Sequence, residues 1–348
     1  MLTRRRLLAV TVPLAATAVV GCSGSSDAPT PSPSTTTPPP TTPSASPSPS
    51  PTASAPPPNP VSVPALKTRE YDGGDLRLGR VLDRDDAYVR YAATFRGDGL
   101  RISGVMNVPR GAGPFPVLIL NHGYIDPAVY RTGQGMMREQ DYLAREGYAV
   151  LHVDYRNHAG SDDDPDVDVE LRLPYSVDVV NAALAVRDSD VAELDGARMG
   201  YFGRSMGGPV TYNALIARPD LVKAAVVYAP TSSVAIDNVR QFYLDDGGRD
   251  EAVAELWRRY GRPDTNPTFW REASSRPYLG DIAQPLLVQQ GEQDDTCPPR
   301  WARATVEAMK AAGGDVELVT YEREGHTFYD QFARSMRRTT RFFDRHLV

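Results

Sequence analysis

A serine between glycines is the strongest candidate for chemistry in this chain. Residues 203–207 read Gly-Arg-Ser-Met-Gly, with Ser205 at the centre. A short apolar run precedes this pentapeptide and a helical pattern follows it, so Ser205 is expected on a sharp strand-to-helix turn. Glycine suits both flanks because a side chain there would collide with the adjoining strand and helix. The pattern predicts a nucleophilic serine and, at Met206, a backbone N–H at a helix start that donates to an oxyanion.

A serine hydroxyl needs a base in contact with it and an acid that orients the base. In an open α/β sheet these partners come from loops after later strands, at the same edge of the sheet. Residues 291–298 contain Asp294, with Asp295 as the alternative acid, and residues 322–328 contain His326. The order Ser205, Asp294, His326 is the order found in α/β-hydrolases. We therefore predict these three residues as a catalytic triad.

The other four histidines are weaker candidates for the base. They are His122 in an early loop, His152 in a predicted strand, His158 in a loop from which it could approach the pocket, and His346 near the C-terminus. For His152, a mid-strand position predicts a buried, hydrogen-bonded side chain.

The second oxyanion donor is expected in the loop after the early strand 116–121. Because Gly123 permits close backbone approach, the amide of Tyr124 is the predicted donor, and the Gly123 N–H is the alternative. The Tyr124 hydroxyl is a further possible donor. A packed aromatic at the pocket mouth is the structural alternative.

The elements that must position these residues alternate between strands and helices. A hairpin is predicted over 88–95 and 100–108, because apolar and polar residues alternate about a Gly-Asp-Gly turn. Short apolar runs at 116–121, 148–154 and 222–228 are typical of strands buried on both faces, and two further strands are predicted at 286–290 and 316–321. Helical patterns occupy 135–146, 175–187, 209–217, 300–312 and 330–347. The fold class is therefore α/β, with a mostly parallel, doubly wound sheet.

Residues 231–281 interrupt this alternation, and we expect them to form a helical cap over the edge of the sheet. The segment contains a helical pattern at 250–260, three prolines and a dense set of aromatic residues: Phe242, Tyr243, Trp257, Tyr260, Phe269, Trp270 and Tyr278. These rings either pack the cap onto the domain or line a substrate pocket, and the sequence leaves both open.

Four motifs in order give the chain a specific resemblance. They are Asn121-His122-Gly123, the Ser205 pentapeptide with Gly208, Gly291-x-x-Asp294-x-x-Cys297-Pro298, and Glu324-Gly325-His326-x-Phe328. Together they resemble the catalytic domain of the prolyl oligopeptidase family within the α/β-hydrolase superfamily, over about residues 88–348. The resemblance implies a serine hydrolase that works through an acyl-enzyme, with Ser205 as nucleophile, His326 as base and Asp294 orienting it.

The chain departs from this family in two places. Family peptidases usually carry a β-propeller before the catalytic domain, and residues 61–87 are too few to form one. Dienelactone-hydrolase-like and acetyl-ester-cleaving relatives share the motifs without a propeller, so this architecture favours an ester substrate. The family often has Val where this chain has Cys297, for which we expect a buried structural thiol.

The N-terminal residues have the pattern of a bacterial lipoprotein. Residues 1–21 combine Arg4, Arg5 and Arg6 with an apolar stretch too short to span a bilayer comfortably, and Cys22 follows directly. We expect Cys22 to be lipid-modified on the outer face of the cell membrane; an ordinary signal peptide is the alternative. The start also resembles a twin-arginine export signal. Residues 22–62 are rich in Ser, Thr and Pro and predict a disordered linker, which leaves 63–348 as the catalytic domain.

Charge and composition exclude several function classes. The net charge is −6, and it becomes −9 without the three arginines of residues 1–21, which argues against a nucleic-acid partner.

The histidines and cysteines form no metal-binding pattern, and we expect neither a metal nor a cofactor. The acidic run 162–166 is expected to be a solvated loop, with calcium as a weak alternative because the spacing is not that of an EF-hand.

The sequence thus predicts an exported serine hydrolase acting on a small ester or a short peptide. Two alternatives stay open: an acyltransferase of the cell envelope, and a surface binding protein without catalysis. The oligomeric state is also open.

Overall fold

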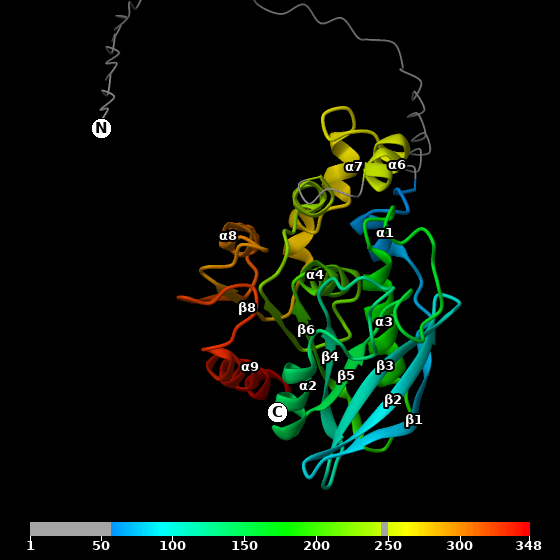
Figure 1. The fold of residues 1–348 in the computed structure, drawn as a ribbon, viewed down its shortest axis with the longest axis vertical. Helices are drawn as coiled ribbons and strands as arrows, with labels where there is room; N and C mark the ends of the chain where they lie inside the picture. Colours follow the sequence, from blue (N-terminus) through cyan, green and yellow to red (C-terminus); the bar gives the residue numbers. More distant parts are fainter. Residues whose placement is uncertain (1–56, 245–249) are drawn as a thin grey trace, which may run out of the picture. The chain divides into compact units, whose positions relative to one another are not determined.

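One mixed sheet crosses the part of the chain that the computed structural model describes, residues 57–244 and 250–348 (Figure 1). The predictions for residues 1–21, for Cys22 and for most of the linker lie outside these residues. The sheet order is β1-β2-β3-β5-β4-β6-β7-β8-β9. The strands are β1 (Gly74–Arg84), β2 (Tyr88–Gly97), β3 (Leu100–Pro109), β4 (Phe115–Asn121), β5 (Ala149–Val153), β6 (Leu194–Arg204), β7 (Ala224–Tyr228), β8 (Leu286–Gly291) and β9 (Val316–Tyr321).

Strands β4 to β9 pair in parallel, whereas β1, β2 and β3 join the sheet in antiparallel fashion. Parallel neighbours require crossover connections, and helices supply them. This is the mostly parallel, doubly wound sheet that the sequence predicts, and the α/β-hydrolase fold class is confirmed. Its consequence for the site is that loops after β4, β6, β8 and β9 meet at one edge.

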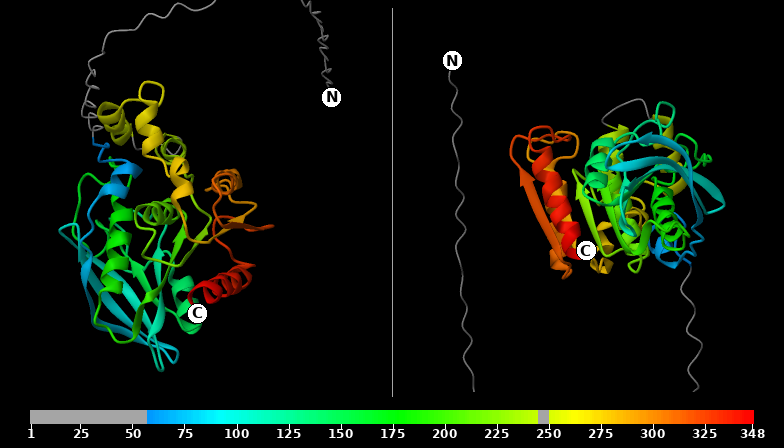
Figure 2. Two further views of the ribbon diagram at one scale, coloured as in Figure 1. Left: turned by 180° about the vertical axis from the view of Figure 1, so that it is seen from behind. Right: turned by 90° about the horizontal axis from the view of Figure 1, so that it is seen from below.

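Helices cover both faces of the sheet (Figure 2). The alternation of β4 shows the two faces, because Val117 and Ile119 join one buried core while Leu118 and Leu120 join the other. Helices α3, α4 and α8 border the first core, and α2 and α9 border the second. The helices outside the cap are α1 (Val63–Thr68), α2 (Met137–Arg145), α3 (Pro174–Arg187), α4 (Gly207–Ala217), α8 (Pro299–Ala311) and α9 (Phe332–Leu347).

The predicted hairpin is present as β2 and β3, joined through Asp98 and Gly99. Both residues have positive φ, at 58° and 74°, as a tight hairpin turn requires. Strand β1 extends this hairpin at the edge of the sheet and was not predicted. Its side chains are exposed or half-buried, and five of its eleven residues are arginine or aspartate, so it carries no buried apolar run.

Residues 231–281 form the inserted helical segment that the sequence predicts. It consists of α5 (Ala235–Val239), η1 (Arg240–Leu244), α6 (Asp250–Tyr260), α7 (Pro267–Glu272) and η2 (Arg276–Asp281). Figure 1 shows α6 and α7, in yellow, beyond one end of the sheet. The segment is inserted between β7 and β8, so the chain returns to the sheet after it.

A buried ion pair holds the loop after β5 against α3. Arg156 Nη2 lies 2.7 Å from Asp178 Oδ1, and these side chains are 4% and 0% exposed. The Asp178 carboxylate also accepts the Arg156 backbone N–H at 2.9 Å. Asp98 and Asp164 complete the set of acids around this guanidinium.

We expect Asp178→Ala to lower the free energy of unfolding by about 3–5 kcal/mol, because it leaves a buried charge short of its partner. Asp188→Ala removes an exposed pair with Arg187 and should lower it by less than about 1 kcal/mol. Urea denaturation of both variants measures the difference. Equal effects would contradict the structural role given to Arg156 and Asp178.

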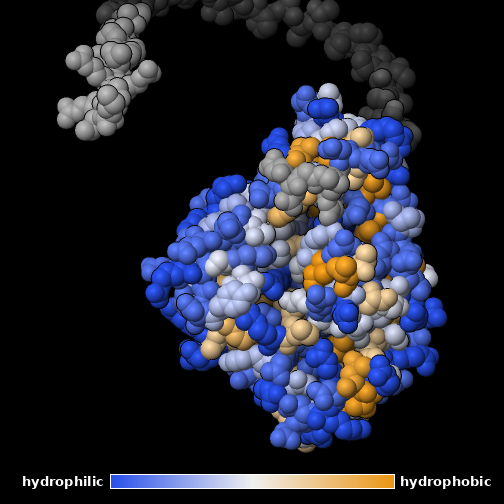
Figure 3. Space-filling view, in the orientation of Figure 1, coloured by the Kyte–Doolittle hydropathy of each residue, from blue (hydrophilic) through white to orange (hydrophobic). Residues whose placement is uncertain are grey.

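The surface on the side shown in Figure 3 is mostly hydrophilic, with hydrophobic side chains in separate groups. Within the described residues, none of the helices has the length and apolar character needed to cross a membrane.

Candidate active site

Ser205 sits between the end of β6 and the start of α4 with a strained backbone. Its φ of 55° lies in the left-handed region that residues with a side chain rarely adopt. Neighbouring backbone groups hold this conformation: Ser205 N–H donates to Tyr228 O at 3.0 Å, and Ser205 O accepts from Gly208 N and Thr231 N. At this turn Ser205 borders the cavity next to the inserted helices.

The glycines on either side of Ser205 are required by space. A Cβ on Gly203 would lie 2.2 Å from Gly207 O, and a Cβ on Gly207 would lie 1.9 Å from Asn121 O. Neither contact is possible without moving backbone. The close approach of Gly207 to Asn121 also brings the loop after β4 beside the nucleophile.

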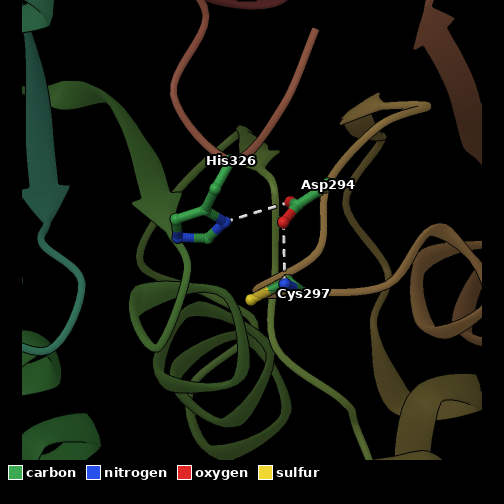
Figure 4. Close-up of side chains that lie close together, drawn as sticks. All are labelled: Asp294, Cys297 and His326. Atoms are coloured by element: carbon green, nitrogen blue, oxygen red, sulfur yellow. Dashed lines mark hydrogen bonds and ion pairs between the residues drawn. The ribbon is translucent and has the colours of Figure 1, made fainter.

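A continuous hydrogen-bonded chain links Ser205 to His326 and Asp294. His326 Nε2 lies 3.1 Å from Ser205 Oγ, and His326 Nδ1 lies 3.0 Å from Asp294 Oδ2. Figure 4 shows the imidazole turned toward the carboxylate. With Nδ1 donating to the acid, Nε2 carries a free lone pair and can accept the serine proton. This arrangement can activate a hydroxyl for attack on an acyl carbon.

Asp294 is buried and held by three donors besides His326. Its Oδ1 accepts the backbone N–H groups of Thr296 at 3.0 Å and Cys297 at 2.7 Å, and its Oδ2 accepts from Gln290 Nε2 at 3.0 Å. The alternative acid, Asp295, is exposed and borders the cavity instead. The geometry therefore brings Asp294, and not Asp295, to the imidazole. Gln290 was not singled out from the sequence, because a glutamine inside an apolar strand gives no sign of where its amide points.

Arg204, the residue before the nucleophile, joins three segments of the site. Its Nη2 donates to Thr327 Oγ1 at 2.6 Å and its Nη1 donates to Gly135 O at 2.9 Å. Because Thr327 follows His326 directly, this arginine ties the histidine loop to the nucleophile strand. The sequence motifs do not predict this role.

Two backbone regions can stabilise an oxyanion beside Ser205. Met206 caps the N-terminus of α4, where N–H groups have no partner inside the helix. The loop after β4 comes close on the other side, since a Cβ on Gly123 would lie only 2.9 Å from Ser205 Cβ. The Tyr124 ring borders the cavity, with the Arg172 guanidinium 4.2 Å from its centroid.

If Tyr124 donates to the oxyanion through its backbone amide, the turnover number of Tyr124→Phe should lie within about threefold of that of the unchanged protein. Loss of a donor to the oxyanion would lower it by about 100-fold or more. Steady-state kinetics on one ester substrate distinguish the two results. A large loss would assign the donor to the hydroxyl.

The side chains of the remaining histidines make no hydrogen bond to Ser205, whose Oγ contacts His326 and Cys297. His122 and His158 are buried and bonded to backbone carbonyls, His122 to Gly123 O and His158 to Arg156 O and Ile125 O. Burial, together with the nearby His158, lowers the pKa of His122 to about 3. His152 is buried within β5, and His346 lies on α9. None of these four is among the described residues that line the cavity next to Ser205.

A cavity of about 670 Å³ opens between Ser205 and the inserted helices. Its wall mixes hydroxyl and amide side chains with apolar ones, and its charged lining consists of Arg172, Asp295 and the titratable His326. Phe242 and Tyr243 line it. The rings of four others instead pack against one another within the cap: Trp257, Tyr260, Phe269 and Trp270. The aromatic residues of the segment are thus divided between the two roles that the sequence left open.

Cys297 lies beside the nucleophile, with its sulfur 3.9 Å from Ser205 Oγ, and it is fully buried. Burial and the charge of Asp294 raise the pKa of this thiol well above its usual range. Asp294, Cys297 and His326 offer ligand atoms within 4.8 Å of one another (Figure 4). A metal there would have to break the bond between His326 and Asp294 and deprotonate this thiol, so the donors fit a triad better than a metal centre.

We expect the folded protein to resist iodoacetamide at Cys297 at pH 7, because the thiolate is the reactive form. Mass spectrometry should find this cysteine unmodified while activity is kept, and alkylated after denaturation in urea. Rapid inactivation that depends on Cys297 would contradict the high pKa.

The acidic run after β5 is paired with arginines and backbone groups. Asp164 accepts from Arg156 at 2.9 Å, Asp166 pairs with Arg259 at 3.0 Å, and Asp162 accepts the Arg101 N–H at 2.8 Å. These carboxylates point to separate partners, and the described residues hold no calcium cage in this loop.

Comparison with known proteins shows the family to which the chain belongs. The model of the prolyl oligopeptidase family matches residues 134–348. The uncharacterized peptidase YuxL of Bacillus subtilis is 24% identical over 268 residues, which is 72% of this chain but 38% of that protein. The chain therefore spans less than two fifths of the length of this relative.

Solved structures share the fold. An acetyl xylan esterase from Paenibacillus sp. R4 aligns with a TM-score of 0.61 at 21% identity, over 82% of this chain and 92% of that one. The Pyrococcus horikoshii acylaminoacyl peptidase aligns with a TM-score of 0.56 at 20% identity, over 74% of this chain and 41% of that one.

Proposed function

Because the chain belongs to the prolyl oligopeptidase family, we propose that it is a serine hydrolase that cleaves an ester or a short-peptide amide. The observation that carries this proposal is the hydrogen-bonded chain from Ser205 through His326 to Asp294, which ends on an open cavity. We assign Ser205 as nucleophile, His326 as general base and acid, and Asp294 as the group that orients the imidazole.

The reaction follows from this geometry in two halves. Ser205 Oγ attacks the acyl carbon while His326 Nε2 takes its proton. The N–H groups of Met206 and Tyr124 bind the oxyanion, and the imidazolium then protonates the leaving group, which leaves an acyl-enzyme on Ser205. A water molecule, deprotonated by the same Nε2, attacks the acyl-enzyme and restores the serine. All groups needed for this cycle are side chains and backbone amides.

The alignment with solved structures supports an ester as the substrate. The chain aligns with nearly the whole of the acetyl xylan esterases, whereas it aligns with 41% of the acylaminoacyl peptidase. Two proteins of this fold that align over most of their own length are thus named as esterases. The peptidase reading rests on the family match and on the peptidases among the relatives.

Paired rate assays test the proposal. We expect hydrolysis of p-nitrophenyl esters, with slower or no release of p-nitroaniline from Ala- and Pro-linked peptide anilides. Ser205→Ala serves as the blank for every substrate. Anilide cleavage at rates equal to ester cleavage would make the protein a peptidase, and equal rates for the original protein and the blank would overturn the proposal. Adding an alcohol acceptor and measuring ester exchange separates hydrolysis from acyl transfer.

We further propose that the protein is exported and anchored in the cell membrane through a lipid on Cys22. The support is the basic and apolar pattern of residues 1–21 directly before this cysteine. Phase partitioning in detergent should place the protein in the detergent phase, and Cys22→Ser should move it to the aqueous phase. An unchanged distribution would refute the anchor.

A further inference from the structure

A buried arginine in the wall of the cavity carries an inference about the substrate, and this inference rests on the proposed function. Arg172 directly precedes the residue that caps α3, and its side chain is 12% exposed. The backbone is fixed by a bond from Arg172 N to Val167 O at 2.9 Å. Among the described residues that line the cavity, it is the one permanent cation.

The Nη edge of this guanidinium lacks an oxygen acceptor within the described residues. Nε donates to Asp168 Oδ1 at 2.8 Å, whereas Nη1 faces only the sulfur of Met206 at 3.8 Å, a weak acceptor. Nη2 is buried, and no described residue offers it a hydrogen-bond partner. An unpaired donor of a buried charged group is costly, so the site gains when an oxygen atom pairs with it.

The surroundings of Arg172 keep its charge while leaving this edge for a ligand. Asp168 is half exposed, so water screens its charge, and it contacts the Nε side of the fork. The rings of Tyr124 and Tyr243 lie 4.2 and 5.3 Å from the guanidinium carbon. Tyr124 is 39% exposed and, like Arg172, lines the cavity.

The position of Arg172 relates it to the acyl part of the substrate. His326 must protonate the leaving group, so the leaving group occupies the His326 side of Ser205. Arg172 instead contacts Met206 and Tyr124, the two residues proposed to hold the oxyanion. A planar pair of N–H donors matches a carboxylate in bidentate geometry. We propose that Arg172 binds a carboxylate on the acyl group, and that the enzyme prefers half-esters of dicarboxylic acids to neutral esters of equal length.

A matched pair of substrates tests this preference. The p-nitrophenyl half-ester of adipic acid and p-nitrophenyl hexanoate have acyl chains of equal length and differ by a terminal carboxylate in place of a methyl group. Arg172→Gln should lower kcat/KM for the half-ester by about 10- to 100-fold, mainly through KM, and change kcat/KM for the hexanoate by less than about threefold. Arg172→Lys should retain part of the preference because it keeps the charge but not the fork.

Two control variants separate binding from other effects. Arg187→Gln changes the net charge equally at the far end of α3 and should alter neither substrate. Asp168→Asn removes the neighbouring acid and should strengthen the preference for the half-ester. If Arg172→Gln lowered kcat/KM equally for both esters, the proposal would be overturned. Arg172 would then be a residue that only positions Met206 and Tyr124. No loss on either ester would overturn it as well.

A binding measurement keeps the inference testable if no ester is hydrolysed. Monomethyl adipate is titrated calorimetrically into Ser205→Ala, with and without the Arg172→Gln change. Weaker binding by about tenfold or more in the double variant supports the carboxylate site even if the hydrolase proposal fails. Equal binding by both variants overturns the carboxylate site and leaves the hydrolase proposal untouched.

Discussion

Replacing Ser205 with alanine should lower the turnover number by about 10⁴-fold or more on every substrate that the protein cleaves. The hydroxyl oxygen forms the covalent bond to the acyl group. No other hydroxyl among the described residues is hydrogen-bonded to His326 Nε2. Ester assays with the purified variant, compared with the spontaneous rate, measure the loss. A residual rate within tenfold of the original would remove Ser205 from the mechanism.

Two controls make this result specific. Ser232→Ala removes another hydroxyl from the same cavity and should change turnover by less than about tenfold. Cys297 lies 3.9 Å from Ser205 Oγ, so Ser205→Ala combined with Cys297→Ala tests whether the thiol supplies any remaining activity. We expect the double variant to match the single one, because burial keeps this thiol protonated.

Asp294→Asn should lower the turnover number by about 10³- to 10⁴-fold, although the substituted side chain has nearly the same shape. The asparagine amide turns its NH₂ toward His326 Nδ1, which favours the tautomer with the proton on Nε2. That nitrogen can then no longer accept the proton of Ser205. The structure supplies a matched control in the neighbouring acid.

Asp295→Asn makes the same chemical change one residue away, on an exposed side chain at the cavity wall. It should change turnover by less than about tenfold. The comparison also settles the choice that the sequence left open between the two acids. If Asp295→Asn proved the more damaging variant, the orienting role of Asp294 would be wrong.

The fold could be predicted from the sequence wherever strands are buried on both faces. The apolar runs that became β4, β5, β7 and β8 stand out against polar loops, whereas the edge strand β9 was predicted from the alternation of strands and helices. Strand order then placed the loops after these strands at one edge. Strand β1 was missed because it is an edge strand with arginine or aspartate at five of its eleven positions. Helix α1 was missed because six residues are too few to show a helical period.

The site could be predicted in part, because its reacting groups lie in short motifs at strand ends. Ser205, Asp294 and His326 are brought together as their motifs suggest. Gln290, Arg204 and Arg172 were not predicted. Their roles depend on the direction of one side chain toward a loop distant in sequence, and neither periodicity nor spacing encodes that direction. The sequence likewise does not show which aromatic residues of the cap line the cavity and which pack within the cap, because this too depends on side-chain direction.

Covalent labelling tests the central claim most directly. A fluorophosphonate probe reacts with an activated serine, and intact-mass spectrometry counts the adducts. We expect one adduct per chain, mapped by peptide sequencing to Ser205, and none in Ser205→Ala or after heat denaturation. An adduct on another residue, or no adduct on protein that hydrolyses esters, would contradict the account.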